Sequence, residues 1–79
     1  MISVNDLSAL LNEIPANGIL RIAANGSSVY IARNGIEITS KITEDTFLVK
    51  GLIGETRDQL AVGSAIIRGD RVDLIQVIL

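Results

Sequence analysis

The sequence predicts an α+β fold that is nearly all β, with an N-terminal helix packed on an antiparallel meander of about six strands. The 79 residues include 13 Ile, 9 Leu and 6 Val but one Tyr and one Phe, and β-branched side chains favour strands. An apolar stripe at helical spacing comes first, and three Asn-Gly pairs follow it. Asn-Gly is the strongest short signal for a hairpin turn. Residues 1–79 are therefore expected to form a single domain, whose sheet could curl into a small open barrel.

The N-terminal segment has the pattern of an amphipathic helix over about 4–14. Its apolar stripe consists of Val4, Leu7, Leu10, Leu11 and Ile14. Ser3 followed by Asp6 resembles a capping box, and Pro15 disfavours helical backbone at the residue before it. A helix of about ten residues is marginal alone, so we expect it to lie against the sheet.

Turn signals divide the rest of the chain into predicted strands. These strands lie near 18–24, 28–33, 36–42, 46–53, 60–67 and 72–79. Two-residue turns at 25–26, 34–35 and 44–45 join the first four, and residues 68–71 form the turn into the last. A helix over 57–67 is the rival for the fifth strand. Its apolar residues would lie all around the helix, so we prefer the strand.

The three two-residue turns agree on one register for the first four strands. They pair Ile22 with Val29, Leu20 with Ile31, Ile31 with Ile38, Val29 with Ser40, Ile42 with Phe47 and Ser40 with Val49. One face then collects Leu20, Ile22, Val29, Ile31, Ile38, Ile42, Phe47 and Val49, and the other collects Arg21, Tyr30, Glu37, Thr39, Lys41 and Lys50. A slip of one residue would mix these two sets.

The composition argues against several kinds of chemistry. The chain has no Cys, which excludes disulfides and thiolate metal sites, and no His, the commonest metal ligand and general base. The acidic pairs at 44–45 and 55–58 fit turns and caps, and no phosphate-binding or nucleophile motif is present. We therefore expect a protein that is not an enzyme, with no catalytic residue, metal or cofactor.

Charge and hydropathy also bear on partners and location. The net charge is −2 and the charged residues are scattered, whereas a strong nucleic-acid binder needs a concentrated basic patch. No apolar run approaches the roughly 20 residues of a membrane span, and the N-terminus lacks the pattern of a signal peptide. We expect a cytoplasmic protein that binds no membrane.

The polar face of the predicted sheet holds one candidate binding strip. Its residues are Arg21, Tyr30, Thr39, Lys41 and Lys50. Such a strip could bind a carboxylate, a phosphate or a single strand. The alternative is a solvated face with an Arg–Tyr cross-strand pair, because single-strand binders stack bases on several aromatic side chains.

The last two strands form a second candidate site, for self-association. A hairpin with its turn at Gly69-Asp70 would have two largely apolar faces, and an exposed apolar last strand invites pairing with another chain. The residues predicted to associate are Val62, Ile66, Ile75, Val77 and Leu79. We expect a symmetric homodimer. In the alternative, the last strand folds back on the first and closes a barrel.

These observations favour a non-enzymatic protein–protein interaction module, a small subunit or regulator that acts through a presented surface. Its expected partners are a second copy and another protein. The alternative is a small nucleic-acid-binding barrel of the OB or SH3-like type. That function would require five cations to converge on one face, namely Arg21, Arg33, Lys41, Lys50 and Arg57.

Overall fold

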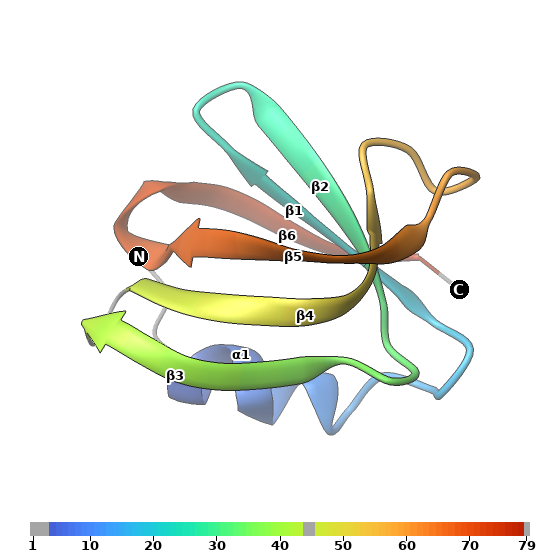
Figure 1. The fold of residues 1–79 in the computed structure, drawn as a ribbon, viewed down its shortest axis with the longest axis horizontal. Helices are drawn as coiled ribbons and strands as arrows, with labels where there is room; N and C mark the ends of the chain where they lie inside the picture. Colours follow the sequence, from blue (N-terminus) through green and yellow to red (C-terminus); the bar gives the residue numbers. More distant parts are fainter. Residues whose placement is uncertain (1–3, 44–45, 79) are drawn as a thin grey trace.

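One helix and six antiparallel strands make up the fold (Figure 1). The computed structural model describes residues 4–43 and 46–78, and the side chains of all of these except 4 and 39–42. The elements are α1 (Val4–Leu11), β1 (Ile19–Ala24), β2 (Ser27–Ala32), β3 (Glu37–Thr43), β4 (Thr46–Gly54), β5 (Ala61–Arg68) and β6 (Val72–Ile78), with the 3-10 helix η1 (Gly69–Arg71) between β5 and β6. The predicted α+β, mostly β class is confirmed, and β5 excludes a helix over 57–67.

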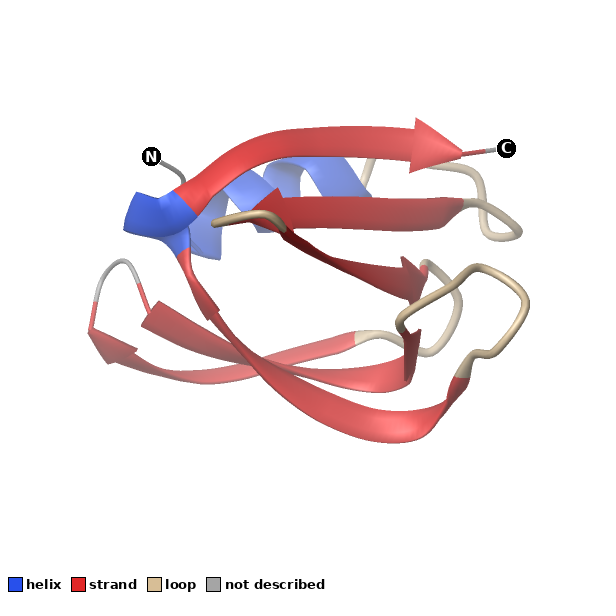
Figure 2. Cartoon of the chain, turned by 90° about the horizontal axis from the view of Figure 1, so that it is seen from above, coloured by secondary structure: helices blue, strands red, loops and turns tan. Residues whose placement is uncertain are grey.

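The strands form one curved, open sheet that folds over into two layers (Figure 2). β1 pairs with β2 on one side and β6 on the other, and these three strands make one layer. β4 pairs with β3 and β5 in the second layer, and a short contact between β2 and β4 joins the layers. The helix α1 lies behind β3 along the lower side of the sheet in Figure 1.

The core lies between the two layers and α1. Its buried side chains are Leu7, Leu11, Ile14, Leu20, Ile22, Ile31, Phe47, Val49 and Ile67. Five of the eight residues predicted for the apolar face are among them, while Val29 and Ile38 are half-buried and pack against the core. The side chain of Ile42 lies outside the described part.

The hairpin predicted at Asn25-Gly26 is confirmed. Both residues have positive φ, 52° for Asn25 and 81° for Gly26, as a type I′ turn requires. Ile22 therefore lies opposite Val29 and Leu20 opposite Ile31.

The hairpin predicted at Asn34-Gly35 is wrong. Of these two residues only Gly35 has a positive φ, 78°, whereas a type I′ turn needs it at both positions. The chain bends there without reversing, so β2 and β3 run one after the other along β4. As a result Ile31 lies opposite Ile53, and the predicted Ile31–Ile38 and Val29–Ser40 pairs do not form.

The register between β3 and β4 agrees with prediction only near their connection. The predicted turn residues 44–45 lie outside the described ranges, but Thr43 is opposite Thr46, as a two-residue turn requires. Bulges then shift the ladder. Lys41 faces Phe47 and Ile38 faces Val49, so the Ile42–Phe47 and Ser40–Val49 pairs are wrong.

The predicted C-terminal hairpin is also wrong. β5 pairs with β4 along its whole length, and β6 pairs with β1 in the other layer. The helix η1, with Gly69 buried, carries the chain across. β5 and β6 are apolar on both faces. Because they belong to different layers, one face of each strand is covered by the opposite layer. β6 does fold back beside β1, as the alternative prediction required, although the sheet stays open.

The helix α1 ends three residues before the predicted boundary. After Leu11 the chain continues in turns, with the Glu13 N–H donating to the Leu10 carbonyl at 3.0 Å. The Arg33 side chain, which follows β2, donates from Nε to the Leu11 carbonyl at 2.6 Å. Arg33 therefore caps the end of the helix.

Candidate functional site

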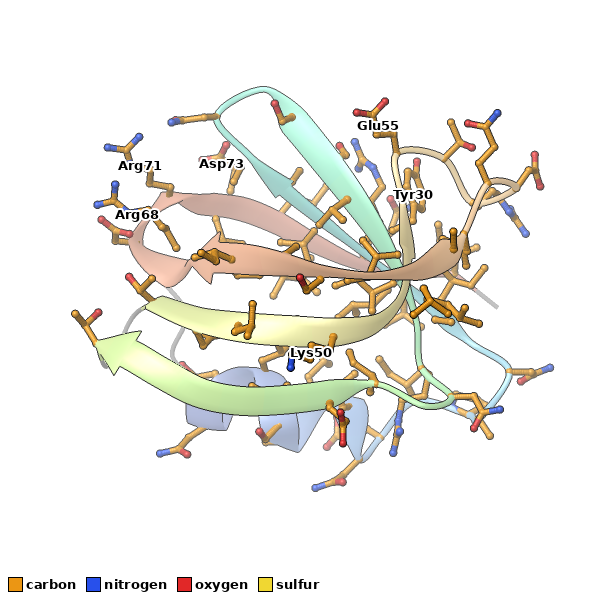
Figure 3. All side chains as sticks on the ribbon, viewed as in Figure 1. Tyr30, Lys50, Glu55, Arg68, Arg71 and Asp73 are labelled. Carbon is orange, nitrogen blue, oxygen red and sulfur yellow. The ribbon has the colours of Figure 1, made fainter. Side chains whose placement is uncertain are left out.

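The three described side chains of the predicted polar strip lie on two different layers. Arg21 and Tyr30 lie opposite each other on β1 and β2, as expected. The Arg21 guanidinium donates to Ser28 Oγ at 3.0 Å and to Gln76 Oε1 at 3.4 Å. Lys50 lies in the other layer, well away from Tyr30 (Figure 3). The side chains of Thr39 and Lys41 lie outside the described part.

The cations that a nucleic-acid interface would need are held at different elements. Arg21 is bonded within the β6–β1–β2 layer, and Arg33 is bonded to the end of α1. Lys50 lies on β4 and Arg57 in the loop before β5. The side chain of the fifth cation, Lys41, lies outside the described part, and the four described cations do not form a continuous basic track for a phosphate backbone.

The residues predicted for self-association are divided between two layers. Val62 and Ile66 lie on β5 and are 89% and 61% exposed. Ile75 and Val77 lie on β6, opposite Ile22 and Leu20 on the core-facing side of β1. Leu79 lies outside the described ranges. Of the four described residues, the β5 pair therefore points away from the core, while Val77 lies on the core-facing side and is still 40% exposed.

Two leucines of β4 complete an apolar surface around that pair. Leu52 lies opposite Val62, and Leu48 lies opposite Ile66. We call these four residues the β4–β5 face. Sequence reasoning missed the leucines, although the period-2 rule places Leu48 outside once Phe47 and Val49 are inside.

A polar row crosses the middle of the β4–β5 face. Lys50 lies between Glu37 of β3 and Ser64 of β5 in the register of the three strands. All three residues are exposed. The row carries one charge of each sign, with an apolar pair on either side of it.

A groove of about 290 Å³ separates the β1–β2 hairpin from β5. Its apolar lining includes Ile22, Val29, Ala65 and Ile67, and Arg68 and Arg71 lie at the end near η1. In Figure 3 these arginines project beside Asp73 at the η1 end of the molecule.

The two described carboxylates near this end, Asp70 and Asp73, already have partners. Asp70 is 3.6 Å from the Arg68 guanidinium, and Asp73 accepts the Asn25 N–H at 3.1 Å. Among the described residues, no acidic side chain lines the groove. Arg71 has no hydrogen-bond or ion-pair partner within the described residues.

Other kinds of site were sought in the same part of the chain. Among the described residues, no three acidic side chains gather where they could hold a metal ion. No helix in those ranges has the length and apolar character needed to cross a membrane. No protein-family model, curated protein sequence or solved structure matches the chain.

Proposed function

We propose that the protein is a non-enzymatic interaction module, a small subunit or regulator, which presents its β4–β5 face to a second copy of itself. The observation that carries this proposal is the exposure of large aliphatic side chains on one strand pair. Val62 is 89% exposed, Ile66 61% and Leu52 41%. Exposed apolar side chains gathered on one face in this way mark interaction sites.

The charges on the face favour a second copy as the occupant. In a two-fold symmetric interface the same surface meets itself, so it must carry groups that complement one another. The central row holds both Glu37 and Lys50. When two such sheets pack face to face, the acid of one copy can meet the base of the other, and the apolar pairs can pack on either side.

The apolar contribution has the size that association needs. Full burial of a large aliphatic side chain stabilises by about 1.5–3 kcal/mol. Two copies together bring six such exposed side chains, while association costs about 4–15 kcal/mol in lost freedom. Because these side chains are 89%, 61% and 41% exposed, their burial contributes less than six full values and is comparable with that cost, so a weak dimer is the expected result.

Sedimentation equilibrium tests this proposal. Val62→Asp should raise the dimer dissociation constant about 100-fold or more, because an unpaired charge is placed inside the interface. Leu74→Asp is the matched control, since Leu74 is 49% exposed but lies on β6. It should leave the dimer intact. A wild-type chain that sediments as an 8.4 kDa monomer at high micromolar concentration contradicts the proposal.

A mixing experiment tests the symmetric arrangement separately. Glu37→Lys and Lys50→Glu should each weaken the homodimer through like-charge repulsion. A 1:1 mixture of the two variants should associate more tightly than either alone, because each supplies the charge that the other lacks. No gain on mixing would show that this row does not cross the interface.

A further inference from the structure

We infer that the groove between the β1–β2 hairpin and β5 binds an extended peptide segment that carries acidic residues, and that the segment adds as a strand to the free edge of β5. The groove shares one lining residue, Ile66, with the β4–β5 face, but the added strand would use the backbone edge of β5 and the space between the layers instead of the outward side chains of that face. The inference therefore goes beyond the proposed function and can fail independently of it.

β5 has an unprotected edge. In the described structure it pairs with β4 alone, so its other side presents unpaired backbone groups. Natural edge strands are usually guarded by charged side chains, Pro or bulges. Residues 61–67 contain no charge and no Pro, and the β4–β5 register has no irregularity. This edge is suited to pairing with another strand.

The register identifies which backbone groups are free. Bonds in an antiparallel pair alternate along the strands. Ala24 and Ser27 flank the two-residue turn and bond each other, so every second residue of β2 from Ser27 on directs its backbone groups toward β1. Tyr30 is one of the residues between these, and it directs its N–H and C=O toward Gly54 of β4. The next residue of β4, Ile53, then turns toward Ala61 of β5.

The same alternation continues along β5. Gly63, Ala65 and Ile67 bond β4, while the residues between them turn their N–H and C=O outward. The free donors and acceptors therefore belong to Val62, Ser64 and Ile66. The Thr43–Thr46 pair leads independently to the same assignment of free backbone groups. Thr46 directs its N–H and C=O toward β3, so the next residue, Phe47, directs its own toward β5.

The groove supplies space and chemistry for the side chains of an added strand. Alternate side chains would point between the layers, where Ile22, Val29 and Ala65 provide apolar contacts. Its volume of about 290 Å³ is near the lower end for ligand pockets. That space fits a few side chains of a peptide whose backbone stays on the edge.

The charge of the groove favours an acidic peptide. Within the described ranges, both charged residues that line it are arginines. Arg68 is shared with Asp70, which leaves Arg71 as the cation available to a ligand. A carboxylate at the η1 end of the bound segment would pair with it.

An extended peptide fits better than a fatty acid, although both can offer apolar groups and a carboxylate. The β5 edge presents backbone donors and acceptors at three alternate residues. A peptide strand can satisfy both kinds of group, whereas an alkyl chain can satisfy neither.

Fluorescence anisotropy with labelled peptides tests the inference. The probes are an eight-residue peptide of alternating Val and Thr with two Asp at one end, the same peptide with Lys in place of Asp, and decanoate as a competitor. The Asp peptide should bind about tenfold more tightly than the Lys peptide. Arg71→Glu should reverse that preference. Equal binding of both peptides, or saturable binding of decanoate with none of the peptide, overturns the inference.

Two further measurements locate the bound strand. Ser64→Pro removes an N–H from the free edge without removing a β4–β5 bond, so it should abolish peptide binding, while Ser64→Ala should retain it. In the wild type, the Asp peptide should slow hydrogen exchange at the amides of Val62, Ser64 and Ile66. Unchanged exchange at these amides refutes strand addition even if the Pro variant does not fold.

A variant of the outer face separates this inference from the proposed function. Leu52→Asp lies on β4, away from the free edge, and should disrupt the dimer but leave peptide affinity within about twofold. Loss of peptide binding in folded Leu52→Asp would mean that the two surfaces are one site.

Discussion

The contact between Arg33 and the end of α1 offers a direct test of how the helix is held. Arg33 Nε donates to the Leu11 carbonyl at 2.6 Å, and the Arg33 backbone N–H donates to the Gly18 carbonyl at 2.9 Å. Arg33→Met keeps the backbone bond and most of the apolar stem. It removes the charged donor, so the Leu11 carbonyl keeps only the longer bond from the Ile14 N–H, at 3.3 Å.

The expected loss of stability follows from that bond. A hydrogen bond from a charged group contributes about 1.5–3 kcal/mol, and a cation at a helix C-terminus contributes about 0.3–1 kcal/mol of overlapping electrostatic energy. Because Arg33 is half-buried and water can replace part of the bond, we expect Arg33→Met to lose about 1.5–2 kcal/mol. For a domain of this size that loss lowers Tm by roughly 10 °C.

Urea unfolding followed by far-ultraviolet circular dichroism measures this loss. All variants are compared at one fixed protein concentration, because the proposed dimerisation would also change the apparent stability. Arg57→Met is the control, since Arg57 is exposed in the loop before β5. It should remain within about 0.5 kcal/mol of the wild type. If Arg33→Met changes the free energy of unfolding as little as Arg57→Met does, the bond to the Leu11 carbonyl does not stabilise the helix and the reasoning is wrong.

The packing makes three further predictions, each readable by the same unfolding assay. Gly54→Ala should destabilise by about 1–3 kcal/mol, because a methyl group there would overlap the Gln59 carbonyl; a neutral effect would mean that the 56–59 turn shifts freely. Leu7→Ala should cost about 2–5 kcal/mol, since Leu7 is fully buried, and a smaller loss would show that α1 packs loosely. Ile75→Asp should unfold the monomer rather than dissociate a dimer, because Ile75 lies opposite the buried Ile22; a folded monomeric variant would restore β6 as the interface.

The elements that local chemistry determines could be predicted from the sequence. The Asn25-Gly26 turn requires only two residues that tolerate positive φ, and it set the β1–β2 register correctly. The division into apolar and polar faces followed from strand periodicity alone. Leu20, Ile31 and Phe47 are buried as predicted, even though some predicted partners across the sheet were wrong.

The pairings that failed depend on tertiary structure. At Asn34-Gly35 the same dipeptide makes a bend, because the free edge of β2 is joined by β4 instead of β3. At 68–71 a short connection joins two layers rather than two neighbouring strands. A local signal cannot distinguish these outcomes, since each depends on where a distant strand lies.

The candidate sites also divide into one that local sequence could predict and one that depends on tertiary structure. Val62 and Ile66 were predicted as association residues because they are apolar, and they are exposed. The groove could not be predicted, because its walls come from residues 22–29 and 65–71. These segments come together only through the pairing of β4 with both β2 and β5.

The pairing of β1 with β6 has a consequence for how the chain folds. Ile19 lies opposite Ile78. β1 can therefore pair with β6 only after the intervening residues have been brought together. Closing a long loop before it yields contacts slows folding. During synthesis β1 must wait for β6, so the outer edge of β1 in the β1–β2 hairpin stays unpaired until β6 has been made. We expect this domain to fold in milliseconds to seconds, as other sheets rich in distant contacts do.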